Sequence, residues 1–151
     1  GGLLGRTNDA DRQAVEQALR LTHTEKFADQ IVDTLSGGDR SRVWLAMCLA
    51  QQSRFLLLDE PLAALDIAHQ IEVMALVQKL SRDLGLGVII VIHDINLAAQ
   101  YCDELVALKQ GRLLKTGRPS EIMTAQVLKD IYSVEMNIIA HPENGRPVAL
   151  P

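Results

Sequence analysis

Leu35-Ser-Gly-Gly-Asp39 and Phe55-Leu-Leu-Leu-Asp-Glu-Pro61 are the two stretches that decide the fold of this 151-residue chain. The first is a glycine-bearing turn that opens a helix, and its bare backbone N–H groups offer a ready anion site. The second is an unbroken apolar run, typical of a strand buried on both faces of a parallel sheet, and it ends in two carboxylates. A phosphate-binding turn close in sequence to metal-binding oxygens indicates nucleotide chemistry.

The composition is that of one ordinary globular domain, with 48% hydrophobic and 23% charged residues. Only 3% of the residues are aromatic, so the core must be aliphatic. The net charge of −4 argues against a protein that binds nucleic acid by general phosphate neutralisation. Cys48 and Cys102 form no CxxC motif, which suits two small buried side chains in a reducing compartment. No apolar run approaches the roughly 20 residues that span a bilayer.

Periodicity and cap residues predict alternating strands and helices, and therefore an α/β fold with a parallel sheet. The expected helices cover about 9–21, 39–52, 66–84 and 95–101, with a shorter helical stretch or turn at 24–34 and two short helices between 119 and 132. The expected strands cover 55–58, 88–92 and 104–108, with a hairpin at 104–115. Residues 134–140 and 146–150 are expected to form a terminal hairpin or an irregular tail. Val43, Met47 and Ala50 are expected to form the apolar stripe of the second helix.

Three side chains that can carry chemistry follow the ends of two predicted strands. Asp59 and Glu60 come after the first strand and His93 after the second. Ligands of parallel sheets bind at the carboxyl ends of the strands, so one carboxylate can orient Mg²⁺ while the other polarises a water. A plain Asp-Glu-Pro turn and a capping or core histidine are the structural alternatives. Asp66, shortly after, is most simply the N-cap of the next helix.

The combination resembles a known family. Leu35-Ser-Gly-Gly-Asp39, Leu56-Leu-Leu-Asp-Glu-Pro61, Ala64-Leu-Asp66 and Ile92-His-Asp94 are similar, in order and spacing, to the signature motif, Walker B strand, D-loop and switch histidine of ABC transporter nucleotide-binding subunits. The resemblance implies that Asp59 helps to hold Mg²⁺, Glu60 is the catalytic base and His93 contacts the γ-phosphate of ATP.

The same resemblance implies that the helix-opening turn serves the opposite subunit. Ser36, Gly37 and Gly38, with Asp39 beside them, would contact the ATP bound there, and Asp66 would communicate across the dimer. The family usually has Gln or Glu where this chain has Asp39, and Ser-Ala where it has Ala63-Ala64. The shorter Asp39 side chain is expected to weaken a polar contact to the nucleotide.

The implied architecture is part of a P-loop NTPase fold of the ABC ATPase type, a mainly parallel sheet flanked by helices. Residues 1–36 would belong to a helical subdomain and residues 37–151 to the C-terminal part of the ATPase core. The implied partners are a second ATP-binding subunit, as a homodimer, and transmembrane permease subunits, but no nucleic acid. Such a subunit is peripheral, at the cytoplasmic face of the inner (plasma) membrane.

The later part of the chain is similar to importers of ferric siderophores, haem and cobalamin. The stretches that carry this likeness are Ile92–Asp103, Leu108–Arg112 and His141–Pro147. The transported substrate follows from the likeness alone.

A phosphate-binding loop of the form G-x-x-x-x-G-K-[ST] does not occur in the sequence. Gly1-Gly-Leu-Leu-Gly-Arg-Thr7 is too short in its spacing and follows no strand, so we reject it as such a loop. The Q-loop and an adenine-stacking aromatic residue are also missing, which predicts the C-terminal part of a longer subunit. We expect this chain alone to bind ATP weakly, to hydrolyse it negligibly, and to be poorly soluble or oligomeric.

Two other functions are compatible with these motifs. An ABC-type ATPase of DNA repair shares them, but it would carry long coiled-coil insertions that this sequence does not contain. A non-catalytic remnant or regulatory module could retain the site as a relic, although Asp59, Glu60 and His93 occurring together argues against it.

Overall fold

The computed structural model describes residues 8–151, which form two compact units. The first unit ends at Val91 and the second begins at Ile92. The first contains one parallel two-stranded sheet, and the second contains two antiparallel two-stranded sheets. The glycine-rich opening, residues 1–7, lies outside the described residues. The predicted boundary after residue 36 stays a prediction.

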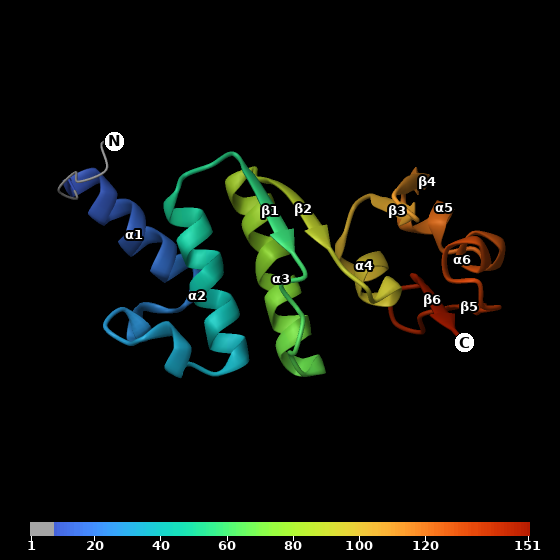
Figure 1. The fold of residues 1–151 in the computed structure, drawn as a ribbon, viewed down its shortest axis with the longest axis horizontal. Helices are drawn as coiled ribbons and strands as arrows, with labels where there is room; N and C mark the ends of the chain where they lie inside the picture. The colour runs from blue at the N-terminus through green and yellow to red at the C-terminus, as the bar shows by residue number, and fades with distance from the viewer. Residues whose placement is uncertain (1–7) are drawn as a thin grey trace. The chain divides into compact units, whose positions relative to one another are not determined.

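The first unit begins with two helices that pack against each other, α1 (Asp9–Thr22) and α2 (Gly37–Ala50) (Figure 1). The predicted stretch at 24–34 is not one helix but two short 3-10 turns, η1 (Glu25–Phe27) and η2 (Val32–Thr34). The buried hydroxyls of Thr22 and Thr24 lie 2.8 Å apart, and Thr22 also donates to carbonyls of the last turn of α1. These bonds end α1 and lead the chain into tight turns.

The buried face of α2 differs from the predicted stripe. Its buried residues are Gly38, Leu45 and Ala46, whereas Met47 is 59% exposed and Trp44 is 61% exposed. The buried face of α1 consists of small side chains, Ala14, Ala18 and Thr22. The face that α2 buries is set by its neighbouring elements, and the hydrophobicity of the helix alone did not identify it.

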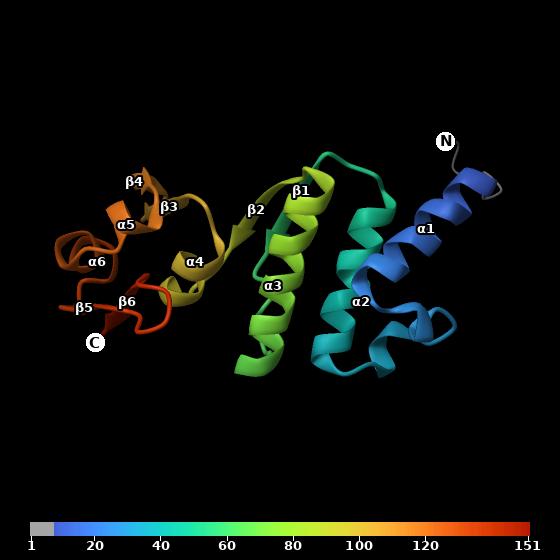
Figure 2. The same ribbon diagram turned by 180° about the vertical axis from the view of Figure 1, so that it is seen from behind.

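The strands β1 (Phe55–Asp59) and β2 (Gly87–Val91) pair in parallel, in a register that runs from Phe55 opposite Gly87 to Asp59 opposite Val91. The predicted parallel pairing is thereby confirmed. The connection between the strands contains α3 (Ile67–Leu84), which lies beside the strand pair in both views (Figures 1 and 2). The apolar side chains buried in these elements are Leu56 and Leu58 on β1 and Val73, Met74, Val77 and Leu80 on α3.

The prediction that the first strand is buried on both faces is wrong for this structure. Leu56 and Leu58 are buried, but Phe55 is 72% and Leu57 is 74% exposed. On β2, Ile89 is likewise exposed. Because successive side chains of a strand point to opposite faces, the alternation means that the first unit covers one face of this sheet. The other face presents apolar side chains.

The second unit is built from short elements. They are α4 (Ile95–Tyr101), β3 (Leu105–Lys109), β4 (Arg112–Gly117), α5 (Pro119–Ile122), α6 (Ala125–Tyr132), β5 (Asn137–Ala140) and β6 (Pro147–Leu150). Both predicted hairpins are confirmed, since β3 pairs with β4 and β5 pairs with β6 in antiparallel fashion. The core of the unit includes Ile122 and Leu128, both fully buried.

The terminal hairpin is fastened to α4 by one asparagine. The Asn96 Nδ2 atom donates to the Ala149 carbonyl at 2.9 Å, and its Oδ1 atom accepts from the Ala149 N–H at 2.7 Å. Arg146 also donates to the Gln100 carbonyl near the end of α4. The Asn96 amide therefore pairs with β6 as a neighbouring strand would.

Replacing Asn96 with Ala is expected to lower the free energy of unfolding by about 1–3 kcal/mol, because the Ala149 N–H and carbonyl lose their partners. Chemical denaturation measures the loss, and amide hydrogen exchange at Ala149 locates it. The matched control is Asn137→Ala, an exposed asparagine on β5 of the same hairpin. Equal effects of the two substitutions would contradict the role given to Asn96.

Candidate functional site

The first part of the site is the start of α2. Ser36 is its N-cap: the hydroxyl accepts from the Asp39 N–H at 3.3 Å and donates to Asp39 Oδ2 at 2.6 Å. Gly37 and Gly38 are the first two helical residues, whose N–H groups have no partner inside a helix. A helix start of this kind can bind an anion, and the binding of nucleotide at this turn stays a prediction. The Asp39 carboxylate, however, already accepts the hydrogen bond that the Ser36 hydroxyl can donate.

The second part is the turn after β1. Asp59 is the last residue of the strand and Glu60 the first beyond it, and both are exposed. Glu60 adopts φ 47°, in the left-handed region, and Ala64 adopts φ 63°. A left-handed residue other than glycine costs roughly 1–2 kcal/mol, and such conformations gather at functional sites. The turn at Glu60 bends the chain away from the strand direction immediately after Asp59.

These carboxylates fit Mg²⁺ as a partial set of ligands. Among residues 8–151, no group of three or more His, Cys, Asp or Glu side chains is arranged to hold a metal ion. Mg²⁺ usually keeps several waters and is held by one or two carboxylates together with phosphate oxygens of a substrate. Asp59 and Glu60 supply oxygens of this kind at the end of one strand. The donor set therefore suits Mg²⁺ that arrives with a nucleotide.

The third part is the start of α3, where Asp66 is the N-cap, as its local sequence predicts. Its Oδ1 atom accepts from the His69 N–H at 2.9 Å, and His69 Nδ1 lies 2.9 and 2.8 Å from the two carboxylate oxygens. The His69 backbone N–H, followed by the His69 side chain, lowers the pKa of Asp66 below its ordinary value.

The start of α2 and the turn before α3 lie against each other. A Cβ atom built on Gly37 would come within 3.2 Å of Leu65 Cδ2, and one built on Gly38 within 2.2 Å of His69 Cδ2. The two predicted motifs, signature turn and D-loop, are therefore in direct contact. His69 was not among the predicted site residues. The available signal was a histidine at the third position after a capping aspartate, where its ring can turn back to the cap.

His93 lies in the second unit, between the end of β2 and the start of α4. It is exposed, and its carbonyl accepts from the Tyr132 hydroxyl at 3.4 Å. Asp94 then caps α4 by accepting from Asn96 N at 2.8 Å and Leu97 N at 3.0 Å. Burial, with a smaller effect of Asp94, raises the pKa of Tyr132. The predicted convergence of His93 with Asp59 and Glu60 involves both units and stays a prediction.

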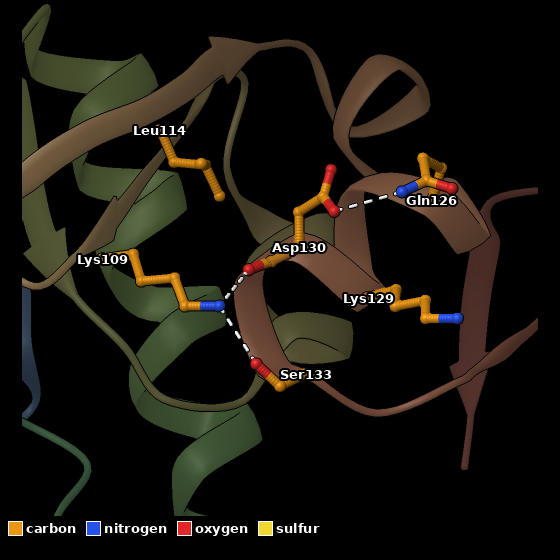
Figure 3. A pocket seen from close by; sticks show the side chains of 6 residues that line it. All are labelled: Lys109, Leu114, Gln126, Lys129, Asp130 and Ser133. Atoms are coloured by element: carbon orange, nitrogen blue, oxygen red, sulfur yellow. Dashed lines mark hydrogen bonds between the residues drawn. The ribbon is translucent and has the colours of Figure 1, made fainter.

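An open pocket of about 570 Å³ lies in the second unit (Figure 3). Its polar groups are largely engaged with each other: Lys109 Nζ donates to the Asp130 carbonyl and to Ser133 Oγ, and Gln126 donates to the Asp130 carboxylate at 3.1 Å. Lys109 thereby caps the Asp130 carbonyl in the last turn of α6. None of the predicted site residues lines this pocket.

Residues 3–63 match the family model described as ABC transporter. The iron(3+)-hydroxamate import ATP-binding protein of Bacillus subtilis (strain 168) is 42% identical over 97% of this chain. The ferric enterobactin transport ATP-binding protein of Escherichia coli (strain K12) is 43% identical over 99% of it. The chain spans 54% and 55% of these relatives, about half their length.

A solved structure assigned to the metal-chelate type of ABC transporter, in an inward-facing conformation, matches 99% of this chain and 61% of its own. The TM-score is 0.90 and the sequence identity 25%. The α/β fold is thus that of an ABC-type ATPase domain, within the P-loop NTPase class. In sequence and in fold, the chain is therefore similar to ABC transporter ATP-binding proteins. None of the helices in residues 8–151 is long and apolar enough to cross a membrane.

The lowered pKa of Asp66 predicts a stability difference that depends on pH. Replacing Asp66 with Asn keeps a capping side chain but removes the charge that His69 stabilises. The folded-state pKa lies below the ordinary 3.8, so the charged carboxylate stabilises the fold above pH 3.8 and loses this effect as the pH falls through the folded value.

The melting temperature of the wild-type chain should therefore exceed that of Asp66→Asn at pH 6, and the difference should shrink as the pH falls below 3.8 and through the folded-state pKa of Asp66. Thermal unfolding followed by circular dichroism measures both. Asp83→Asn, on the exposed end of α3, is the control substitution. A constant difference between wild type and Asp66→Asn across this pH range would contradict the assigned origin of the pKa shift.

Proposed function

We propose that this chain supplies the signature turn, the Walker B carboxylates, the D-loop and the switch histidine of an ATP-hydrolysing subunit of an ABC importer. The observation that carries the proposal is a pair of contacts: Gly37 lies against Leu65, in the turn that follows Asp59 and Glu60, and Gly38 lies against His69, in the first turn of α3. Helix-opening amides and acidic oxygens are thereby held in one compact unit. Phosphoryl transfer depends on this kind of positioning and charge compensation more than on covalent chemistry by the protein.

Glu60 is the proposed catalytic base. Glu60 is exposed just past the end of β1, and its backbone adopts the left-handed region. In this role Glu60 accepts the proton of the water that attacks the γ-phosphate of ATP. Asp59, the preceding residue, is the proposed ligand of Mg²⁺. Bound together with ATP, Mg²⁺ supplies charge compensation for the phosphates.

Ser36, Gly37, Gly38 and Asp39 are proposed to contact the ATP held by a second copy of the subunit. The first N–H groups of α2 and the positive end of its dipole suit phosphate oxygens. The Ser36 hydroxyl donates to Asp39 here, so the backbone amides are the main donors left for the phosphates. The contact of the D-loop with this turn supports a role for Asp66 in linking the two nucleotide sites.

His93 is proposed to contact the γ-phosphate. It follows a strand of the parallel pair and precedes a capped helix, which fixes the backbone on its C-terminal side. The Tyr132 hydroxyl and the Asp94 cap hold the carbonyl of His93 and the first turn of α4. An imidazole held in this way can hydrogen-bond a phosphate oxygen.

The proposed partners are a second ATP-binding subunit and transmembrane permease subunits, at the cytoplasmic face of the membrane. The proposed cargo is an iron(III)-siderophore or a related metal chelate. Both relatives named above are iron-chelate transport proteins, and the structural neighbour is assigned to the metal-chelate type. These likenesses favour an importer over an ATPase of DNA repair.

Replacing Glu60 with Gln in the complete subunit is expected to lower the ATP turnover rate by roughly a hundredfold or more, because the amide cannot accept the proton of water. The shape of the side chain is kept, so ATP affinity should change little. Phosphate release measures turnover, and calorimetry measures binding. The control is Glu135→Gln, a glutamate 85% exposed on the second unit. Unchanged turnover would remove Glu60 from its proposed role.

The cargo is tested by uptake in cells or vesicles that contain the complete subunit and its permease. Labelled ferric siderophore should accumulate with the wild-type subunit and not with Glu60→Gln, because hydrolysis drives the transport cycle. Labelled haem and cobalamin, offered separately, distinguish the related cargoes. Hydrolysis without accumulation of any of the three chelates would refute the cargo while leaving the ATPase assignment intact.

A further inference from the structure

We propose that His69 is a positioning residue that fastens the turn before α3 to the signature turn at the start of α2. It belongs to neither predicted motif, yet it lies between them. Its ring contacts Gly38 of the signature turn and its Nδ1 atom contacts Asp66 of the D-loop. The proposal rests on the function proposed above, because it concerns the same two elements.

The contact between His69 and Gly38 is closer than any side chain at position 38 would permit. A Cβ atom there would lie 2.2 Å from Cδ2, 2.9 Å from Cγ and 2.9 Å from Nε2 of His69. Real Cβ atoms are essentially never found within 3.0 Å of another heavy atom. Gly38 is also buried. The space that a side chain would need is therefore filled by the imidazole ring.

The ring is held in this place by Asp66. His69 Nδ1 lies 2.9 and 2.8 Å from the two carboxylate oxygens, and the His69 N–H donates to the same carboxylate at 2.9 Å. Two groups of one residue thus bind one side chain, which limits rotation of the ring about χ1 and χ2. The His69 side chain is 43% exposed, so solvent is open to the ring. A swing of the ring into solvent would break its contact with Asp66.

The arrangement forms a continuous chain of contacts from the D-loop to the phosphate-binding amides. Asp66 caps α3 and orients His69, and His69 fills the space beside Gly38. A second contact, Leu65 against Gly37, runs parallel to it. A movement of the D-loop is therefore transmitted to the first amides of α2. The histidine positions the groups that would bind nucleotide without touching the nucleotide itself.

The contact is tested first without nucleotide, by thermal unfolding of four forms of the chain: wild type, Gly38→Ala, His69→Ala and the double variant. In the wild-type background, Gly38→Ala should lower the melting temperature by about 5 °C, because the new methyl group collides with the ring. In the His69→Ala background the same change should be neutral or raise it, because Ala favours a helix more than Gly does.

The expected result is that Gly38→Ala lowers the melting temperature with His69 present and does not lower it with Ala at position 69. An equal decrease in melting temperature in both backgrounds would contradict the contact between His69 and Gly38. Gly37→Ala, which meets Leu65 and not His69, is the control, and its effect should be independent of residue 69. If His69→Ala fails to fold, His69→Phe and His69→Asn serve instead. The first keeps a ring beside Gly38, and the second keeps a donor for Asp66.

The positioning role is tested in the complete subunit by steady-state ATP hydrolysis. His69→Ala should raise KM for ATP about tenfold, while kcat changes less than twofold. A tenfold change corresponds to the energy of one charge-assisted hydrogen bond, here the bond of His69 with Asp66 that holds the signature turn in place. His69→Asn should restore part of the loss, because the D-loop side of the contact survives. An unchanged KM alongside a confirmed contact would overturn the positioning role alone. Absence of ATP binding in the wild-type subunit would instead reject the function proposed above.

Discussion

The packing of the turn after β1 against the first residues of α2 is the constraint on which the site depends. Two left-handed residues, Glu60 and Ala64, shape that turn at a cost in backbone energy. Burial of Leu62 and the cap that Asp66 gives to α3 offset this cost. The carboxylates at the end of β1 and the amides at the start of α2 are thereby held in one unit. If the carboxylates and the amides moved independently, a change at one group would not affect the position of the other.

Features that depend on a few neighbouring residues were predictable from the sequence. Asp66 caps the helix that it was expected to cap, the turn at Ser36 opens a helix as expected, and Gly85 ends α3 in the left-handed region. The strands and both hairpins also follow from patterns in the sequence, such as the β-branched run Val88–Ile92 and the turn residues Gln110 and Gly111. For the caps and the turns, sequence neighbours supply the hydrogen-bond partner or the backbone freedom that decides the structure. The partners of β1 lie on β2, further along the chain, and the alternation of strands and helices is what indicated that pairing.

Features that depend on distant residues were not predictable. The stripe of α2 was misassigned because its apolar residues encircle the helix, and only packing in the folded unit selects Leu45 and Ala46. The alternating burial along β1 reflects how much of the sheet this chain covers, which the apolar run itself cannot indicate. His69 escaped notice because its importance comes from Gly38, thirty-one positions earlier in the sequence.

The start of α2 offers two kinds of hydrogen-bond donor to an anion, the Ser36 hydroxyl and the backbone amides. A serine hydroxyl offers one proton, and here that proton is directed to the Asp39 carboxylate at 2.6 Å. A phosphate at the same turn must either take that hydroxyl from Asp39 or rely on the backbone amides. Binding the phosphate through the amides costs less free energy than breaking the hydrogen bond between Ser36 and Asp39. Helix geometry already orients the amides, and the helix dipole favours a negative charge at this end. The position of the helix start, and hence of the contacts at Gly37 and Gly38, then matters more than the Ser36 side chain.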